Sequence, residues 1–211
     1  MKWLNVALPK GRLGDQVYRT LARSGYSCPG GPGEDRRLIL ENPEAAVRYY
    51  LVKPSDVAVY VERGAADAGI VGRDVLLETE PDVYEMADLK MGVCRMCVAG
   101  RPDFRDDHVR PLRVATKYPR ITRRYYAGRG RQIELIKLNG SIELAPILGL
   151  SDVIVDLVET GTTLKENHLE VIQEVAQISA RFIANKSSFK FRNKEIEKVL
   201  EGLAQVVESR G

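Results

Sequence analysis

The chain has 211 residues, of which 44% are hydrophobic and 29% are charged, a composition typical of globular proteins. Its 32 basic and 29 acidic residues leave a formal charge of +3, too small to indicate nucleic-acid binding by itself. No apolar run approaches the roughly 20 residues of a membrane helix, and the N-terminus begins with a strand-like segment rather than a signal peptide. We therefore expect a cytoplasmic protein without a membrane or nucleic-acid partner, folded as one large domain or two small ones.

The first predicted strand, Leu4 to Leu8, ends at Pro9, and a helix is predicted from Asp15 to Ser24 with Gly25 as its stop. A basic turn joins the two elements and consists of Lys10, Gly11 and Arg12. Open α/β sheets bind ligands at the turn between a strand and the following helix. A solvated surface turn would have the same composition, so both interpretations stay open.

A second predicted strand, Tyr49 to Val52, leads into Lys53, and a short strand, Ala68 to Val71, precedes a helix that opens at Arg73. Three small or acidic residues border the short strand: Asp67, Gly69 and Gly72. Small residues here allow close packing of a helix on the sheet. They equally allow a flat base to lie against the backbone, and the sequence does not decide between these interpretations.

Tyr84 to Ala99 alternates in part between polar and apolar residues and is predicted to be one long strand that crosses between two lobes. Cys94 and Cys97 within it form a single C-x-x-C. A zinc site needs four ligands, and no histidine has suitable spacing. We interpret these cysteines as reduced thiols packed in a strand, with a redox pair as the alternative.

Positive charge is concentrated between Arg101 and Arg131, around a predicted strand, Leu112 to Ala115, and the helix after Pro119. Such a run is usually a solvated face, and the alternative is a field that attracts polyphosphate ligands. A further strand, Ile133 to Leu138, leads to a helix predicted from Ile142 to Leu148. Three positions of that segment stand out: Ser141 as its predicted N-cap, Glu143 in its first turn, where a carboxylate suits the helix dipole, and Gly149 beyond its end.

The most informative stretch runs from Asp152 to Leu164. Val153 to Val158 is aliphatic apart from Asp156, as expected for a strand buried on both faces. The residues that follow are Glu159, Thr160, Gly161, Thr162 and Thr163. Glycine lets the backbone approach a ligand, and successive N–H groups with hydroxyls surround a phosphate. Because the two carboxylates would repel that phosphate, we expect them to accept hydrogen bonds from sugar hydroxyls.

A last strand, Val175 to Ala184, and an amphipathic helix, Glu195 to Val207, complete the chain. Alternating strands and helices predict an α/β fold with mainly parallel sheets. The two ligand-binding turns, near Lys10 and near Thr160, lie far apart in sequence. A two-lobed protein with its ligand cleft between the lobes would bring them together.

Four stretches together resemble the ATP phosphoribosyltransferase family. They are L-P-K-G-R-L (Leu8 to Leu13), G-A-A-D-A-G-I-V-G-R-D-V-L (Gly64 to Leu76), T-K-Y-P (Thr116 to Pro119) and L-N-G-S-I-E-L-A-P-I-L-G-L-S-D-V-I-V-D-L-V-E-T-G-T-T-L (Leu138 to Leu164). The match spans nearly the whole chain, and its last block is highly specific.

The resemblance implies an enzyme that joins ATP to 5-phosphoribosyl-1-diphosphate (PRPP), with Mg²⁺, and releases N1-(5-phosphoribosyl)-ATP and diphosphate. It is the first step of histidine biosynthesis. The implied fold is the two-lobed one of type II periplasmic binding proteins. Lobe one would comprise residues 1–90 and 180–211 and face ATP, and lobe two, residues 91–179, would carry the PRPP phosphate loop.

The resemblance also suggests roles for individual residues. PRPP would be bound by Asp156, Glu159, Thr160, Gly161, Thr162 and Thr163. ATP would be bound by Lys10, Gly11, Arg12, Lys53, Asp67, Gly69 and Gly72. Glu143 and Arg12 are the catalytic candidates. No metal ligand is expected from the protein, because the substrate diphosphate would carry most of the Mg²⁺.

The family has long and short forms, and this chain resembles the short form, which lacks the C-terminal regulatory domain. It is therefore expected to form a homodimer that assembles with a regulatory subunit related to histidyl-tRNA synthetase, through which histidine would act. Two rival classes of protein share part of this pattern. A binding receptor shares the architecture but needs no phosphate loop, and a single-sheet phosphoribosyltransferase would not explain P-K-G-R-L.

Overall fold

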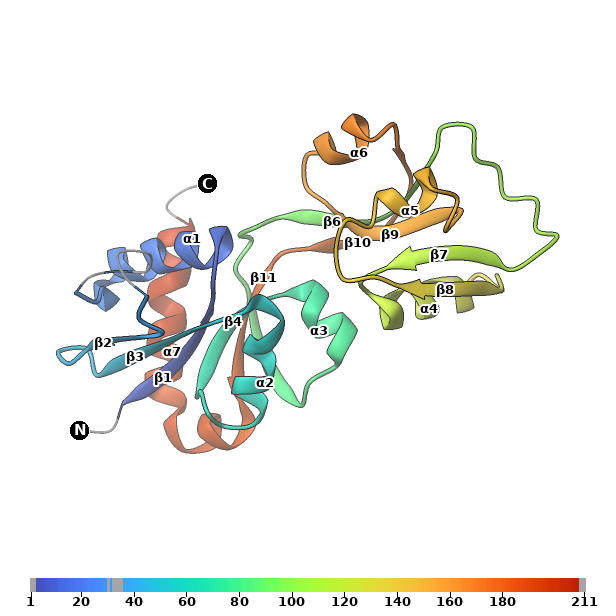
Figure 1. Cartoon of the computed structure of the whole chain (residues 1–211). Helices are drawn as coiled ribbons and strands as arrows, with labels where there is room; N and C mark the ends of the chain where they lie inside the picture. Colours follow the sequence, from blue (N-terminus) through green and yellow to red (C-terminus); the bar gives the residue numbers. More distant parts are fainter. Residues whose placement is uncertain (1–2, 30, 32–35, 209–211) are drawn as a thin grey trace. The chain divides into compact units, whose positions relative to one another are not determined.

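The structure is a computed structural model that describes residues 3–29, 31 and 36–208. It divides into two compact units. The first comprises Met1–Leu76, Glu80–Gly92 and Ser179–Gly211, and the second comprises Leu77–Thr79 and Val93–Ile178. Each unit has its own sheet and its own helices (Figure 1). In the part of the chain that the structure describes, no helix has both the length and the apolar character to cross a membrane.

The first unit is built on a six-stranded sheet with the order β2-β3-β1-β4-β11-β5. Its strands are β1 (Leu4–Pro9), β2 (Ile39–Asn42), β3 (Val47–Val52), β4 (Ala68–Gly72), β5 (Val83–Asp88) and β11 (Ala180–Asn185). The three strands β3, β1 and β4 are parallel, whereas β2, β11 and β5 run antiparallel to their neighbours. The carboxyl ends of the three parallel strands therefore meet at one edge of the sheet.

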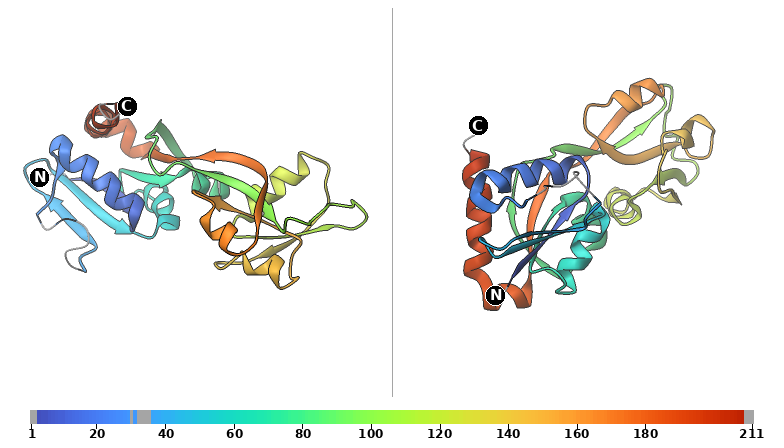
Figure 2. Two further views of the ribbon diagram at one scale, coloured as in Figure 1. Left: turned by 90° about the horizontal axis from the view of Figure 1, so that it is seen from above. Right: turned by 60° about the vertical axis from the view of Figure 1, so that its left-hand side comes forward.

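Helices cover both faces of this sheet (Figure 2). They are α1 (Arg12–Leu21), which continues into a π-helical turn (Ala22–Tyr26), α2 (Val57–Glu62), preceded by a 3-10 turn (Pro54–Asp56), α3 (Arg73–Thr79) and α7 (Lys186–Glu208). α1 and α7 pack side by side, with Val17, Leu21 and Ile196 in one apolar cluster. α2 packs on the other face through Val57 and Val61. Apolar residues at helical spacing make these packed faces.

The second unit has a five-stranded sheet with the order β10-β6-β9-β7-β8. Its elements are β6 (Cys94–Gly100), β7 (Leu112–Thr116), α4 (Pro119–Ala127), β8 (Ile133–Lys137), α5 (Leu144–Ile147), β9 (Val153–Val158), α6 (Thr162–Glu166) and β10 (Glu170–Ile178). The central strand β9 is parallel to β7 and antiparallel to β6. Val153 and Val155 face the α4 side, and Ile154 and Val158 face α5 and α6. The prediction of a central strand buried on both faces is confirmed.

The prediction of mainly parallel sheets holds only for part of each sheet, β3-β1-β4 and β9-β7-β8. The antiparallel strands include those through which the chain passes from one unit to the other. The predicted single strand Tyr84 to Ala99 is two strands, β5 and β6, with left-handed backbone at Lys90 and Gly92 between them. The predicted strand Val175 to Ala184 is likewise split at Ser179. Alternation continues through each break, so the pattern did not show it.

Acidic partners neutralise part of the basic segment. The carboxylate of Asp152, at the start of β9, accepts hydrogen bonds from both Arg110 Nη1 and Nη2 (2.8 Å each) and from Arg113 Nη2 (2.7 Å). Asp106 binds Arg131 at 2.7 and 2.9 Å. The interpretation of the whole segment as a polyphosphate-attracting field is therefore wrong for these arginines. Because the Arg110 guanidinium and then Arg113 stabilise its charged form, the pKa of Asp152 lies well below its ordinary value.

We predict that Asp152→Asn lowers the free energy of unfolding at pH 7 by about 2 kcal/mol, because it weakens several charge-assisted hydrogen bonds to a side chain that is mostly buried. A carboxylate whose pKa is lower in the folded state than in the unfolded state stabilises the protein at pH values above its unfolded-state pKa. This stabilisation is lost as the pH falls through the folded-state pKa. The difference between variant and wild type should thus shrink below about pH 4. Urea unfolding across pH would measure it, with Asp103→Asn, in an exposed pair with Arg101, as the near-neutral control. A constant difference down to pH 2 would contradict this explanation.

Candidate active site

A cavity of about 250 Å³ lies in the second unit, at the carboxyl end of β9. It brings together all seven residues that the sequence predicts for this unit, Glu143, Asp156, Glu159, Thr160, Gly161, Thr162 and Thr163, and four apolar residues, Ile154, Leu157, Val158 and Leu164, complete its wall. The cavity lining thus combines polar and apolar side chains. The prediction that these residues form one site is consistent with this placement, although their individual roles stay predictions.

Gly161 shapes the turn between β9 and α6. Its backbone is left-handed, with φ 80° and ψ 2°, a conformation that glycine adopts without steric cost. A Cβ built on Gly161 would meet only Val158, at 3.9 Å, so glycine is needed here for its conformation rather than for space. Alternating backbone conformations of this kind turn successive N–H groups toward one concave surface, which suits an anion.

Threonine hydroxyls line the same turn. Thr160 Oγ1 and Thr162 Oγ1 lie 2.9 Å apart, and Thr162 N donates to Thr160 Oγ1 at 3.4 Å. Thr160, Thr162 and Thr163 are all exposed. The hydroxyls therefore hold one another in position at the surface, where a ligand oxygen can replace the contact between them. We call the residues Thr160 to Thr163 the threonine turn.

Three carboxylates surround the threonine turn. Asp156 is half-buried near the end of β9, and its Oδ1 accepts a hydrogen bond from Leu157 N at 2.8 Å. Glu159 is exposed, and Glu143 is half-buried just before α5. The helix at Glu143 differs from the prediction: α5 has four residues, and Ser141 is not its N-cap but has left-handed backbone, with φ 49°. Glu143 itself occupies the N-cap position without a capping hydrogen bond from its side chain, which leaves the carboxylate at the cavity wall.

The first unit has a second group of predicted residues, at the carboxyl edge of β3, β1 and β4. Pro9, the last residue of β1, is paired with Val52, the last residue of β3. Lys10 and Lys53 follow these two residues directly, and Lys10 N donates to Val52 O at 2.8 Å. Gly72 ends the neighbouring strand β4. The structure therefore places Lys10, Gly11, Arg12, Lys53 and Gly72 at one edge of this sheet, as binding at the carboxyl ends of parallel strands requires.

Two residues predicted for the ATP site, Asp67 and Gly69, make structural contacts within the first unit. Asp67 precedes β4 and so lies at the opposite edge from Lys10. Its Oδ2 accepts from Asn5 N and from Arg192 Nη1, both at 2.9 Å, in a nearly buried ion pair. Gly69 is buried, and a Cβ there would lie 2.8 Å from a methyl group of Val61 in α2. Close helix packing thus accounts for Gly69, and the placement gives no support for contact of either residue with a base.

Gly14 is a positioning residue that the sequence pattern did not reveal. A Cβ built on it would lie 1.6 Å from the carbonyl oxygen of Pro9, so only glycine lets α1 begin this close to the end of β1. Gly11 between them has φ 91° and ψ −168°, which also requires glycine. These two glycines fix the basic turn of Lys10 and Arg12. A glycine at the third position of an amphipathic helix was the available signal.

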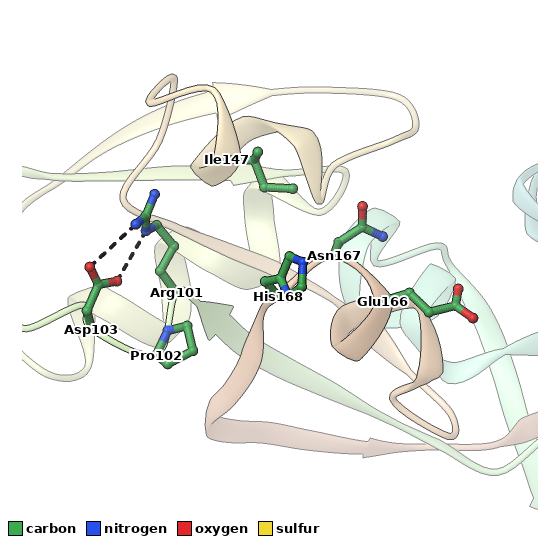
Figure 3. Close-up of a pocket in the computed structure, with 7 residues that line it drawn as sticks. All are labelled: Arg101, Pro102, Asp103, Ile147, Glu166, Asn167 and His168. Atoms are coloured by element: carbon green, nitrogen blue, oxygen red, sulfur yellow. Dashed lines mark hydrogen bonds and ion pairs between the residues drawn. The ribbon is translucent and has the colours of Figure 1, made fainter.

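Another cavity of the second unit, about 340 Å³, lies beyond the other end of α6 (Figure 3). It is lined by Arg101, Pro102, Asp103, Ile147, Glu166, Asn167 and His168. Arg101 Nε is bound to Asp103 at 3.1 Å, and Glu166 points away from this pair (Figure 3). Asn167 Nδ2 donates to Thr163 O at 2.8 Å. Asn167 therefore stabilises the end of α6 through Thr163 O.

Cys94 and Cys97 are the remaining candidates for a metal or redox site. Among residues 3–29, 31 and 36–208, no group of three or more His, Cys, Asp or Glu side chains is placed to hold a metal ion. Cys94 and Cys97 lie on β6 outside any disulfide, and burial raises the pKa of Cys97. That shift disfavours the reactive thiolate, as expected of cysteines that serve packing. Carboxylates beside the threonine turn are suitable donors for Mg²⁺ only together with substrate oxygens.

The two sheets and the placement of the site at strand ends define a two-unit α/β protein of the type II periplasmic-binding-like class. Comparison with solved structures agrees: the ATP phosphoribosyl transferase (HisG:HisZ) complex from Thermotoga maritima matches with a TM-score of 0.85 and 37% identity, over 98% of this chain and 99% of that one.

Sequence comparison identifies the family. The model of HisG, ATP phosphoribosyltransferase, matches residues 53–205. A curated ATP phosphoribosyltransferase of Brachyspira hyodysenteriae is 53% identical over 97% of this chain and all of its own length. That of Halalkalibacterium halodurans is 46% identical over the full length of both. The chain belongs to the ATP phosphoribosyltransferase family, whose reaction is the first step of histidine biosynthesis.

We predict that Gly14→Ala destabilises the first unit by about 1–3 kcal/mol or more, because the added methyl overlaps the Pro9 carbonyl. Gly128→Ala is the control: Gly128 has ordinary helical backbone and contacts no closer than 3.5 Å, so it should be neutral or stabilising by about 0.4–1 kcal/mol. Thermal and urea unfolding would compare the two variants. Equal stability would show that α1 can move away from β1 without cost.

Proposed function

We propose that the threonine turn binds the 5-phosphate of PRPP. The observation that supports this most strongly is the left-handed turn at Gly161 with three exposed threonine hydroxyls around it, at the end of a buried central strand. Backbone N–H groups and hydroxyls supply neutral donors to a phosphate and hold it at a fixed point. A fixed phosphate in turn orients the ribose ring that carries the reacting carbon.

Asp156 and Glu159 are proposed to accept hydrogen bonds from the ribose hydroxyls or to contact the Mg²⁺ shell. Both line the cavity directly beside the threonine turn. Carboxylates repel the negatively charged phosphate, whereas they accept hydrogen bonds readily from sugar hydroxyls. Glu143 lies at the cavity wall and is proposed to stabilise the positive charge that develops on the ribose.

Lys10, Gly11 and Arg12, with Lys53 and Gly72, are proposed to bind ATP and to meet polyphosphate. Their common position at the carboxyl edge of β3, β1 and β4 supports this proposal. Arg12 in particular is proposed to stabilise the negative charge of the leaving diphosphate. Asp67 and Gly69 are not included, because the ion pair with Arg192 and the packing of α2 account for them.

The reaction asks mainly for positioning and charge stabilisation. Adenine N1 attacks C1 of the ribose and forms a C–N bond while the C–O bond to diphosphate breaks. Positive charge grows on the sugar and negative charge grows on the leaving group. Holding both substrates in line lowers the entropic part of the barrier, and fixed charges stabilise the separating ones. When bound, Mg²⁺ would neutralise part of the charge on the diphosphate.

The subunits of the active protein are also part of the proposal. The structural relative from Thermotoga maritima is described as a HisG:HisZ complex. By analogy, this chain is proposed to form a homodimer in the cytoplasm that assembles with a regulatory subunit related to histidyl-tRNA synthetase. Histidine would then act through that second subunit.

The direct test is to mix the chain with ATP, PRPP and Mg²⁺ and to follow N1-alkylated adenine by its absorbance and by mass. The expected product is N1-(5-phosphoribosyl)-ATP, with and without an added synthetase-like subunit. If neither mixture yields product while both substrates bind, the chain is a binding protein and the proposal fails.

We predict that Thr162→Val weakens PRPP binding by about tenfold, because it removes one hydroxyl donor to a charged group and keeps the side-chain volume. The affinity for ATP should change less than twofold, as should both affinities of the exposed control variant Ser187→Ala. Calorimetric titration measures all four. Loss of ATP affinity with PRPP binding intact would reverse the proposed division of the site.

A further inference from the structure

The lining of the cavity at the threonine turn contains carboxylates but no basic side chain. The carboxylates are those of Glu143, Asp156 and Glu159. PRPP carries a 5-phosphate and a diphosphate, and close carboxylates oppose such an anion in a poorly solvated site. This inference rests on the proposed binding of PRPP here. It concerns a basic side chain of the second unit just beyond this lining, in addition to Lys10 and Arg12 proposed above.

Lys117 occupies that place. Thr116, the last residue of β7, is paired with Val155 of the parallel strand β9. The next residues along the two strands are Lys117 and Asp156, so they are neighbours at the same edge of the sheet. Adjacent strands lie about 4.8 Å apart. Lys117 is exposed and makes no hydrogen bond or ion pair with the described residues.

The side chain of Lys117 belongs to the same face as the cavity. Ala115 packs in the apolar cluster of α5 and α6, whereas Val114 and Tyr118 pack in the cluster of α4 on the other face. Because strand residues alternate between faces, Lys117 shares the α5 and α6 side with Ile154 and Asp156.

The backbone that carries Lys117 is fixed by a buried hydroxyl. Thr116 Oγ1 donates to Val155 O at 2.7 Å and accepts from Tyr118 N at 2.8 Å. The side chains of all three residues are buried. The backbone segment Thr116 to Tyr118 is thereby bound to β9 one residue before Asp156. A lysine on a rigid turn loses little backbone freedom when it binds a ligand.

β9 separates Lys117 from the threonine turn. The threonine turn leads into α6, which contacts β10, the strand beyond β6, on one side of β9. Lys117 follows β7, on the other side of β9 (Figure 1). Asp156 lies between them. We propose that Lys117 binds the diphosphate of a PRPP molecule whose 5-phosphate is in the threonine turn and whose ribose lies over Asp156.

Three variants test the assignment. Lys117→Met removes the charge, and Lys117→Arg keeps it. Lys137→Met is the matched control, because Lys137 ends the neighbouring strand β8, is also exposed, and pairs with Thr116, which places it on the α4 face. Calorimetry measures binding of PRPP with Mg²⁺ and of ribose 5-phosphate, which has no diphosphate. Thermal unfolding checks that each variant is folded.

We expect Lys117→Met to weaken PRPP binding at least about tenfold and ribose 5-phosphate binding less than about twofold. Lys117→Arg should stay within about threefold and Lys137→Met within about twofold for both ligands. The proposal would be overturned if folded Lys117→Met bound PRPP within twofold of the wild-type affinity. It would also be overturned if the variant lost affinity for PRPP and for ribose 5-phosphate equally.

The same titrations distinguish this inference from the proposed function. Binding needs no ATP, so the expected pattern without any transferase product would support the Lys117 assignment and overturn the reaction. A folded wild-type chain that binds no PRPP would overturn both.

Discussion

The left-handed turn at Gly161 is the constraint on which the candidate site depends. It lets the chain leave the buried strand β9 and begin α6 immediately, with Thr160 and Thr162 in contact across it. A residue with a Cβ would be strained at this φ, and the hydroxyls would no longer be held over the cavity. Asn167 fixes the turn from the far end of α6 through Thr163 O. The turn is thus bounded by a buried strand on one side and a short helix on the other.

The two ends of β9 use carboxylates in opposite ways. Asp152, at the start, is bound by Arg110 and Arg113 and serves stability. Asp156, near the carboxyl end, lines the cavity. The same contrast appears in the first unit, where Asp67 is paired with Arg192 at one edge and the basic turn lies at the other. In both sheets the carboxyl edge of the parallel strands is where chemistry is available, as expected for α/β folds.

Much of the second unit's site was predictable because its residues are contiguous. β9, its aspartate and the threonine turn lie within thirteen residues, and local conformation determines their geometry. Glu143 was predictable chiefly through the family resemblance, since its four-residue helix and uncapped start differ from the expected Ser141-capped helix. The crossing strands were misjudged because alternation continues through the breaks near Gly92 and Ser179. The ion pair of Asp67 was not predicted because its partner Arg192 is 125 residues away in the chain, which no local pattern reveals.

The central claim is that the threonine turn binds the 5-phosphate, and a crystal structure with ribose 5-phosphate tests it most directly. The account predicts phosphate oxygens within hydrogen-bond distance of the Thr160–Thr163 N–H groups and hydroxyls, with the ribose hydroxyls toward Asp156 or Glu159. A phosphate bound at the Lys10 turn instead, with the threonine turn unchanged and holding only water, would contradict it.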